Sequence, residues 1–348
     1  MKNILVTGAG SLLGQGLLRL LKISDFEKKI YTADPMSLSS GHWLGDEALL
    51  IPKVTEENYL DEIKKIVFEK KIDAILVGTD VELPILARNK SEFLNLYNCK
   101  IIVSDIDVIN ISNDKYLTAE FLKENNFPYP FSVMANDLDG MQEIKKIFGF
   151  PLFAKPIDGA RSLGIKIINN DQELDEIYDE NSNLTIQQYL DEDDGEYTSG
   201  CLVVEGKCKA IVTLRRDLRD GNTYRAYRDE FTSKYDEVII KIAECLNPDG
   251  PVNFQFRIFN SQPVIFEING RFSGTTPLRY FFGFNEVQVL LNYYLFGKQI
   301  VKPTLKMGTV LRVWSDLFVE NKQINDLNTE NSLVNPSAIF YNFNLLNE

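Results

Sequence analysis

Two short runs decide the fold: Asn253-Phe-Gln255-Phe-Arg257 and Pro263-Val-Ile-Phe-Glu267-Ile-Asn269-Gly-Arg271-Phe-Ser-Gly274. Polar and apolar residues alternate in both, which is typical of half-buried strands. The Ser261-Gln262-Pro263 segment between them is suited to a turn. We therefore expect two antiparallel strands joined by a hairpin.

Polar side chains gather on one face of this hairpin. Side chains two apart on a strand share a face, so Glu267, Asn269 and Arg271 should project the same way, with Ile265 as the apolar exception. Gln255 can lie opposite them on the first strand. Oxygen ligands in incomplete number suit Mg²⁺, which keeps waters and takes further ligands from nucleotide phosphates. The alternative is a solvated strand face that ends in a turn.

The order of these motifs resembles the metal-binding core of ATP-grasp enzymes. It is most similar to the version in the large subunit of carbamoyl phosphate synthetase, where glutamine takes a place that is acidic in many relatives. The resemblance implies that Gln255, Glu267 and Asn269 hold Mg²⁺. It also implies that Arg271 stabilises the transferring phosphate and an acyl-phosphate, since a guanidinium binds phosphoryl oxygens well. The neutral glutamine argues against a tightly held second Mg²⁺.

Composition narrows the class of protein. With 348 residues, 44% of them hydrophobic, the chain can form two or three domains with real cores. Its net charge of -13 opposes binding to nucleic acid or to an anionic membrane. No apolar run approaches the roughly 20 residues that span a bilayer, so we expect a cytoplasmic protein. The single histidine, His42, lies in a polar stretch where a surface or packing role is expected, and this disfavours catalytic triads that need a histidine.

The first 110 residues predict a doubly wound α/β domain. Strand-like runs at 4–7, 30–34, 73–77 and 100–103 alternate with helical patterns. Gly8-Ala-Gly10-Ser-Leu-Leu-Gly14 follows the first strand, but Leu13 stands where a dinucleotide fingerprint requires glycine. Asp80 and Glu82 follow the strand at 73–77. Because ligands favour this end of parallel strands, both are candidates for an amine-bearing substrate, against helix capping or solvated charge.

The segment after this domain contains two lysines of interest. A helix is expected from 112 to about 125, with Ser112 or Asn113 as its cap and Lys115 in its first turn. Lys155 ends an apolar strand and is followed by a loop of small residues that returns to a strand at 165–168. Such a loop can place an ammonium and backbone N–H groups around a polyphosphate. The alternative is an ordinary hairpin with a long tip.

The ATP-grasp resemblance covers roughly residues 1–300 and assigns roles along this segment. It implies that residues 157–164 form the phosphate loop and that residues 184–190 form the hinge strand whose main chain contacts adenine. The implied nucleotide-binding residues are Lys115, Lys155, Ser162, Gln188, Tyr189, Leu190 and Glu196.

An arginine-rich stretch suggests an anion site. Residues 215–225 contain four arginines, which is unusual in so acidic a chain. The alternative is a solvated loop whose arginines pair with its own aspartates. We select Arg216 and Arg225 as candidates for a substrate carboxylate, and Arg279 as a third candidate beyond the hairpin.

The expected architecture is a pre-ATP-grasp doubly wound domain followed by a two-subdomain ATP-grasp fold, of mixed α/β and α+β class. The expected bounds are 1–111 for the first domain, 112–190 for the small subdomain, 191–300 for the large subdomain and 301–348 for a C-terminal strand and tail. No tandem repeat is evident, so one active site is implied.

The resemblance implies an ATP-dependent ligase. ATP would phosphorylate a carboxylate, and an amine or a thiol would then attack the acyl-phosphate with release of ADP and phosphate. Mg²⁺ is the expected metal, Mn²⁺ could replace it, the substrates are small molecules, and a homodimer is compatible with the sequence. The alternatives are an NAD-dependent oxidoreductase or epimerase at residues 8–14, and a nucleotide-binding protein without turnover.

Overall fold

The computed structural model describes residues 1–158, 164–180, 183–190, 195–313 and 315–340. Contacts within the chain define two units, which do not follow chain order. Unit 1 consists of Met1–Asp105, Arg271–Leu305 and Arg312–Glu348. Unit 2 consists of Ile106–Gly270 and Lys306–Leu311. Residues on either side of Gly270 therefore belong to different units, and the expected large subdomain of 191–300 contributes to both.

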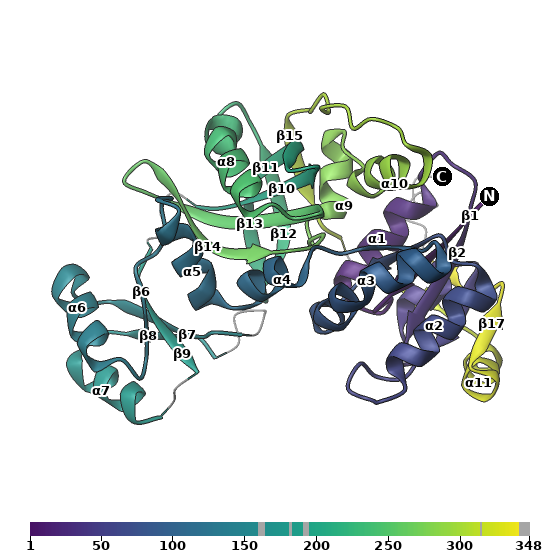
Figure 1. The fold of residues 1–348 in the computed structure, drawn as a ribbon, viewed down its shortest axis with the longest axis horizontal. Coiled ribbons are helices and arrows are strands. Elements are labelled where there is room, and N and C mark those ends of the chain that lie inside the picture. The colour runs from purple at the N-terminus through teal and green to yellow at the C-terminus, as the bar shows by residue number, and fades with distance from the viewer. Residues whose placement is uncertain (159–163, 181–182, 191–194, 314, 341–348) are drawn as a thin grey trace. The chain divides into compact units, whose positions relative to one another are not determined.

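Unit 1 contains a six-stranded sheet in the order β17-β3-β2-β1-β4-β5 (Figure 1). Its first five strands along the chain are parallel, as expected for a doubly wound domain, because their apolar runs are buried on both faces. The sixth strand, β17, comes from the C-terminal region and pairs antiparallel with β3. The bounds are β1 Lys2–Thr7, β2 Lys28–Asp34, β3 Glu47–Leu50, β4 Ala74–Val77, β5 Lys100–Ile102 and β17 Ser332–Val334.

Helices follow the strands of unit 1, as the sequence pattern predicts for a doubly wound domain. The Ser11 hydroxyl accepts a hydrogen bond from Gly14 N, which caps the first helix. The bounds are α1 Leu12–Lys22, α2 Tyr59–Lys70, α3 Leu83–Tyr97, α9 Thr276–Arg279, α10 Glu286–Phe296 and α11 Asn321–Glu330. No helix in the described part of the chain is both long and apolar enough to cross a bilayer.

Unit 2 contains two antiparallel sheets (Figure 1). The smaller has the order β6-β9-β7-β8, with β6 Ser132–Met134, β7 Leu152–Pro156, β8 Lys166–Ile168 and β9 Leu184–Gln188. The larger has the order β14-β13-β10-β11-β12-β15. Its bounds are β10 Glu196–Val204, β11 Lys207–Arg219, β12 Asn222–Arg228, β13 Gly250–Phe259, β14 Gln262–Asn269 and β15 Gly308–Leu311.

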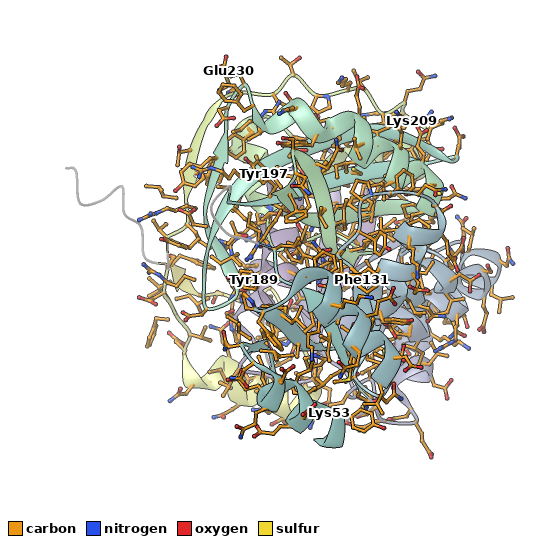
Figure 2. The ribbon with its side chains drawn as sticks, turned by 90° about the vertical axis from the view of Figure 1, so that its left-hand side faces the viewer. Lys53, Phe131, Tyr189, Tyr197, Lys209 and Glu230 are labelled. Carbon is orange, nitrogen blue, oxygen red and sulfur yellow. The ribbon has the colours of Figure 1, made fainter. Side chains whose placement is uncertain are left out.

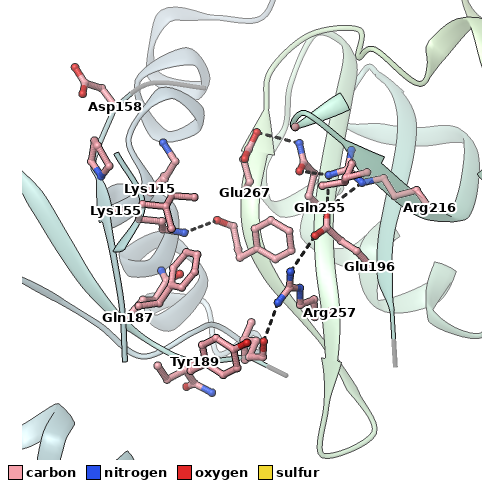
Figure 3. A pocket seen from close by; sticks show the side chains of 18 residues that line it. Lys115, Lys155, Asp158, Gln187, Tyr189, Glu196, Arg216, Gln255, Arg257 and Glu267 are labelled. Atoms are coloured by element: carbon pink, nitrogen blue, oxygen red, sulfur yellow. Dashed lines mark hydrogen bonds and ion pairs between the residues drawn. The ribbon is translucent and has the colours of Figure 1, made fainter. Parts of the chain in front are cut away.

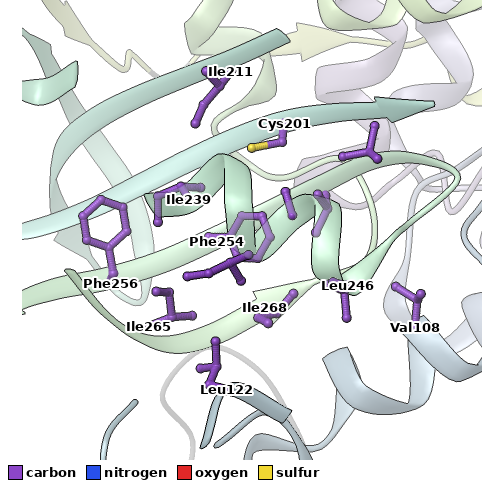
Figure 4. Close-up of a cluster of buried hydrophobic side chains, with 14 residues drawn as sticks. Val108, Leu122, Cys201, Ile211, Ile239, Leu246, Phe254, Phe256, Ile265 and Ile268 are labelled. Carbon is purple, nitrogen blue, oxygen red and sulfur yellow. The ribbon is translucent and has the colours of Figure 1, made fainter. Parts of the chain in front are cut away.

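One face of the larger sheet packs on helix α8, Asp236–Leu246, through a cluster of buried side chains that includes Phe254, Ile239 and Ile268 (Figure 4). Helices α4, Ile106–Asn113, and α5, Lys115–Glu124, contact β14. Helices α6, Leu138–Phe148, and α7, Asp171–Glu180, accompany the smaller sheet. The opposite face of the larger sheet is therefore left for polar side chains.

Two local expectations were wrong. The cap of α5 is Asp114, whose carboxylate accepts from the backbone N–H groups of Tyr116 and Leu117, whereas Ser112 belongs to α4. The arginine-rich stretch is not a loop, because it forms the paired strands β11 and β12 around a turn at Asp220-Gly221. Both residues of this turn have positive φ, which glycine adopts readily and aspartate tolerates.

The predicted hairpin is present and contains a bulge. Gln255 pairs with Glu267, but the next residue, Phe256, pairs with Ile265, so Phe266 has no partner across the ladder. Ile265 therefore turns into the core, while Phe266 and Glu267 are both half-buried on the polar face. The bulge explains why Ile265 interrupts the alternating pattern. Because β14 ends at Asn269, the shared-face rule does not extend to Arg271.

The docking of the C-terminal segment on unit 1 can be tested at Leu327. This side chain is completely buried on α11, which contacts β3 and β17. We expect Leu327→Ala to lower the free energy of unfolding by about 2–4 kcal/mol in urea denaturation, because it leaves a cavity. Val334→Ala, at an exposed side chain of β17, should change it by less than about 0.5 kcal/mol. Equal stability of the two variants would contradict this docking.

Candidate functional site

A pocket in unit 2 lies between the smaller sheet and the polar face of the larger one (Figure 3). Its walls come from α5, β7 and β9 on one side and from β10, β11, β13 and β14 on the other. The pocket brings together most of the side chains selected from the sequence. Those that line it are Lys115, Lys155, Gln188, Tyr189, Leu190, Glu196, Arg216, Gln255 and Glu267.

Two lysines face the pocket from α5 and β7. Lys155 is 4% exposed, and its Nζ donates to the carbonyl oxygen of Phe266 at 3.3 Å. Burial lowers the pKa of Lys155 to about 7, assisted by the charges of Lys115 and Arg257 and opposed by Glu267. Burial also lowers the pKa of Lys115. An anionic ligand would reverse the cost of burying these ammonium groups.

Opposite the lysines, the paired strands β13 and β14 present a carboxylate and two carboxamides. Glu267 Oε1 accepts from Gln255 Nε2 at 2.9 Å and from Asn269 Nδ2 at 3.0 Å. No three His, Cys, Asp or Glu side chains gather for a metal anywhere in the described ranges. One carboxylate with carboxamide oxygens fits Mg²⁺ that completes its shell with waters and phosphate oxygens.

A chain of hydrogen bonds runs on from Gln255 across the larger sheet (Figure 3). Gln255 Oε1 accepts from Arg216 Nη2, and Arg216 Nε donates to Glu196 Oε1 at 3.0 Å. Glu196 Oε2 also accepts from Arg257 Nη2 at 3.2 Å. Arg257 Nη1 donates to the carbonyl oxygen of Leu190 at 2.8 Å. Glu196 is thus clamped between two guanidiniums that together exceed its charge.

Sequence reasoning did not select Arg257 or Phe266. The signal for Arg257 is its position two residues after Gln255 on one strand, which places both on one face. Phe266 reaches the pocket because of the bulge, which the alternating pattern does not reveal. Its ring lies 5.9 Å from Lys155 Nζ and 5.9 Å from the guanidinium carbon of Arg257, so it separates two cations.

The hinge segment at the end of β9 is held through its backbone and through one side chain. Gln188 N donates to Phe131 O, and Gln188 Oε1 accepts from Phe131 N, both at 2.9 Å. The Gln188 side chain is therefore engaged in joining β9 to the segment before β6. Tyr189, labelled in Figure 2, packs against Phe153, and their ring centroids are 6.4 Å apart. Ser162 lies outside the described residues.

Arg271 and Asp80 meet within unit 1. Arg271 pairs with Asp80 through Nε and through Nη2, the latter at 2.8 Å, and Arg271 Nη1 donates to Phe272 O at 2.8 Å. Arg271 is 14% exposed and Asp80 is 44% exposed by side chain. This bidentate contact fixes the plane of the guanidinium. It was not anticipated, because 191 positions separate the two residues.

The structure replaces two substrate candidates with structural roles. Glu82 is 4% exposed and accepts hydrogen bonds from Thr7, Tyr59 and Thr79. Arg279 is 1% exposed and donates to Glu286 at 2.7 Å. Both side chains are committed to the interior, so we do not retain them as substrate ligands.

The position of Arg225 also differs from the expectation that it binds a substrate carboxylate in the pocket. Arg225 lies on the exposed side of the β11–β12 hairpin, 3.6 Å from Asp217, and it does not line the pocket.

In unit 1, Asp34 at the end of β2 accepts hydrogen bonds from Gly10 N of the glycine-containing loop at 2.9 Å and from Ser39 Oγ at 2.6 Å. The acid that would bind the ribose of a dinucleotide is therefore held by the loop itself, which argues against the NAD alternative.

Comparison with known families agrees with this architecture. Residues 4–102 match the PylC-like N-terminal domain. Residues 112–245 match the RimK-like ATP-grasp domain, and residues 180–314 match the ATP-grasp family found in a biosynthetic pathway with the Ter operon. The two ATP-grasp matches overlap and together contain every residue of the pocket.

Curated relatives at this level of similarity are carbamoyl phosphate synthase large chains. The chain is 25% identical over 308 residues to that of Thermoanaerobacter pseudethanolicus, covering 80% of this chain and 27% of the relative. It is 23% identical over 306 residues to that of Helicobacter pylori, covering 79% and 27%. The chain thus spans about a quarter of the length of these relatives.

Solved structures share the fold. N5-carboxyaminoimidazole synthetase from Staphylococcus aureus, complexed with ADP, has a TM-score of 0.70 at 16% identity, covering 94% of this chain and 85% of that one. Biotin carboxylase from Campylobacter jejuni has a TM-score of 0.69 at 16% identity, covering 92% and 76%. L-amino acid ligase from Bacillus licheniformis has a TM-score of 0.62 at 16% identity, covering 85% and 74%.

These similarities confirm the two expectations that concern architecture, a doubly wound N-terminal region and an ATP-grasp fold after it. They also confirm the resemblance to the carbamoyl phosphate synthase large chain. Residues 112–314 are thus similar, through two overlapping matches, to ATP-grasp domains.

Proposed function

We propose that this protein is an ATP-dependent ligase that activates a carboxylate by phosphoryl transfer and joins it to an amine or a thiol, with release of ADP and phosphate. The observation that carries the proposal is the pocket of unit 2. A half-buried lysine on α5 and a buried lysine on β7 face a carboxylate flanked by carboxamides on β13 and β14. That arrangement provides positive charge for phosphates and oxygen ligands for the metal that accompanies them.

ATP would lie between the two sheets. Lys155 and Lys115 would hold its phosphates, and the backbone of residues 188–190 would contact the adenine, with the Tyr189 ring beside it. Two structural relatives support the binding of an adenine nucleotide by this fold. The Staphylococcus aureus synthetase is complexed with ADP, and the biotin carboxylase domain from Hydrogenobacter thermophilus is complexed with MgADP. Glu196, with Ser162 of the loop, completes the proposed nucleotide contacts.

Glu267 and Asn269 would hold Mg²⁺, and Mn²⁺ could take the same place. When bound, the metal would neutralise charge that develops on the phosphates. Glu267 has one oxygen engaged by two carboxamides, and this fixes the direction of its carboxylate plane. The protein supplies alignment and fixed charge, because the described pocket contains no histidine or cysteine for acid-base or covalent steps.

The substrates are proposed by chemical class. Arg271 would stabilise the transferring phosphate and the acyl-phosphate, with its guanidinium plane fixed by Asp80. Asp80 is the remaining candidate for the amine, and Arg216 and Arg225 remain candidates for the carboxylate. Because the match covers only 27% of the curated relative, the substrates and partners of that protein are not transferred to this chain. A homodimer is proposed by analogy with the Hydrogenobacter carboxylase domain dimer.

A second candidate function is nucleotide binding without turnover. It is favoured by one observation, since the only carboxylate among the three metal ligands predicted from the sequence is Glu267. Measuring ADP release in mixtures of carboxylates and amines separates the two functions. ADP release that depends on both substrates would establish the ligase, whereas tight nucleotide binding with no release in any mixture would establish the alternative.

Lys155 makes nucleotide binding depend on pH. Burial lowers the pKa of Lys155 to about 7, from the 10.5 of an exposed lysine. Between pH 7 and pH 10.5 the unfolded chain therefore holds the proton more tightly than the folded protein, and the contribution of Lys155 to the stability of the fold rises with pH. Phosphates should raise this pKa, so ATP binding at pH 8 should take up as much as about one proton. Calorimetry in buffers of different ionisation enthalpy measures this uptake.

Lys155→Ala should abolish turnover and most of the proton uptake. Lys209→Ala, outside the pocket, is the control (Figure 2). Equal uptake in both variants would refute the role of Lys155.

Glu267→Gln removes the negative charge from the metal site while keeping its size. We expect turnover to fall below detection and the effect of Mg²⁺ on nucleotide affinity to disappear, because a neutral carboxamide holds Mg²⁺ poorly. The melting temperature should stay within a few degrees of the wild type. Glu230→Gln, at an exposed position outside the pocket, is the matched control (Figure 2). Full activity of Glu267→Gln would refute the assigned role.

A further inference from the structure

The carboxamide of Gln255 is held from both sides by groups of opposite charge. Its Oε1 accepts from Arg216 Nη2, and its Nε2 donates to Glu267 Oε1 at 2.9 Å (Figure 3). Arg216 reaches Gln255 from β11 across the intervening strand β10. Its side chain is 9% exposed, so this contact is shielded from water. The carboxamide of Gln255 is therefore held in one orientation, unlike the side chain of an exposed surface residue.

The two neighbours determine which end of the carboxamide faces which way. A guanidinium has only donors, and an ionised carboxylate has only acceptors. Turning the Gln255 carboxamide over would place its NH₂ against Arg216 and its oxygen against Glu267. Both hydrogen bonds would be lost, and like charges would face each other in a half-buried site. While Arg216 is present, Gln255 therefore directs N–H and not oxygen toward Glu267.

A metal beside Glu267 consequently gains no ligand from Gln255. Asn269 differs, although its Nδ2 also donates to Glu267 Oε1, at 3.0 Å. In the described ranges, the hydrogen bond of the Asn269 side chain is the one to Glu267 and involves no guanidinium, so this carboxamide can turn its oxygen toward a cation. The sequence-based expectation that Gln255 holds Mg²⁺ together with Glu267 and Asn269 thus does not suit these contacts.

Arg216 also introduces permanent positive charge at this place. A guanidinium does not lose its proton in proteins. Glu196 offsets part of this charge, but it is shared with Arg257. The group of two arginines and one glutamate therefore carries a net charge of about +1 beside Gln255. A second divalent cation near Gln255 would be repelled, whereas a phosphate would be attracted.

Resting on the proposed function, we propose that this pocket takes one divalent cation, at Glu267 and Asn269. In place of a second metal, the guanidinium of Arg216 supplies positive charge to the phosphates of the nucleotide. Arg216 is thereby assigned to the phosphates in place of the substrate carboxylate, and Gln255 is the residue that positions it.

The number of bound metal ions tests this proposal directly. Mn²⁺ serves as the probe, and the electron paramagnetic resonance signal of free Mn²⁺ counts the bound ions. The protein is kept in slight excess over a non-hydrolysable ATP analogue, so that free nucleotide binds little metal. We expect one Mn²⁺ in each wild-type complex. Arg216→Met should raise the count to two, because Gln255 can then turn its oxygen toward Glu267.

Arg215→Met is the matched control. Arg215 is the preceding residue of β11, and its guanidinium lies 4.6 Å from the ring centre of Tyr227, outside the pocket. This variant loses the same charge from the same strand and should keep a count of one Mn²⁺. A rise to two in both variants would mean that net charge, and not the contact with Gln255, limits the count, and it would overturn the proposal.

Failure of this inference and failure of the proposed function give different results. Two Mn²⁺ in the wild-type complex, with spin coupling between them, would overturn the inference while leaving ATP binding intact. An unchanged count of one in folded Arg216→Met would overturn it as well. If Arg216→Met does not fold, the wild-type count decides alone. Absence of binding of the ATP analogue to the wild type would instead refute the proposed function.

Discussion

The register between β13 and β14 is the constraint on which the site depends. It sets Gln255 opposite Glu267 and Asn253 opposite Asn269, and the bulge at Phe266 keeps the core side of the strand apolar while two consecutive residues reach the pocket. A shift of one residue would exchange the two faces and move Glu267 toward the helix α8 side. The buried cluster beneath the sheet, which includes Phe254 and Ile268, opposes such a shift (Figure 4). The core and the site are therefore specified by the same ladder.

Positive charge is concentrated on one wall of the pocket. Lys155 is buried with a backbone carbonyl as its hydrogen-bond acceptor, and Arg257 and Lys115 add positive charge nearby. On the opposite wall, Glu267 and Glu196 are surrounded by carboxamides and guanidiniums. Burying cations at this density has a free-energy cost that a polyanion can offset. The same cost lowers the pKa of Lys155 to about 7.

The two units do not correspond to two consecutive stretches of the sequence, because each is assembled from separate segments. The chain leaves unit 2 after Gly270, directly after β14, and the C-terminal strand β17 adds to the edge of the sheet in unit 1. This strand covers β3, which would otherwise present unpaired backbone groups. Arg271 and Asp80 show the same principle at the level of side chains, since residues distant in sequence form one bidentate pair.

The sequence alone was sufficient for the fold class, for the hairpin and for most residues of the pocket. Alternation along β13 and β14 and the helical periodicity of the N-terminal region are local properties, and the order of motifs made the family resemblance visible. Local patterns could not show that Arg216 reaches over β10 to Gln255, that Phe266 enters the pocket, or that Glu82 and Arg279 are buried. These features depend on strand order, on a bulge and on contacts between distant segments, and only the tertiary structure decides them, because the free energy of a buried charge depends on which partners surround it.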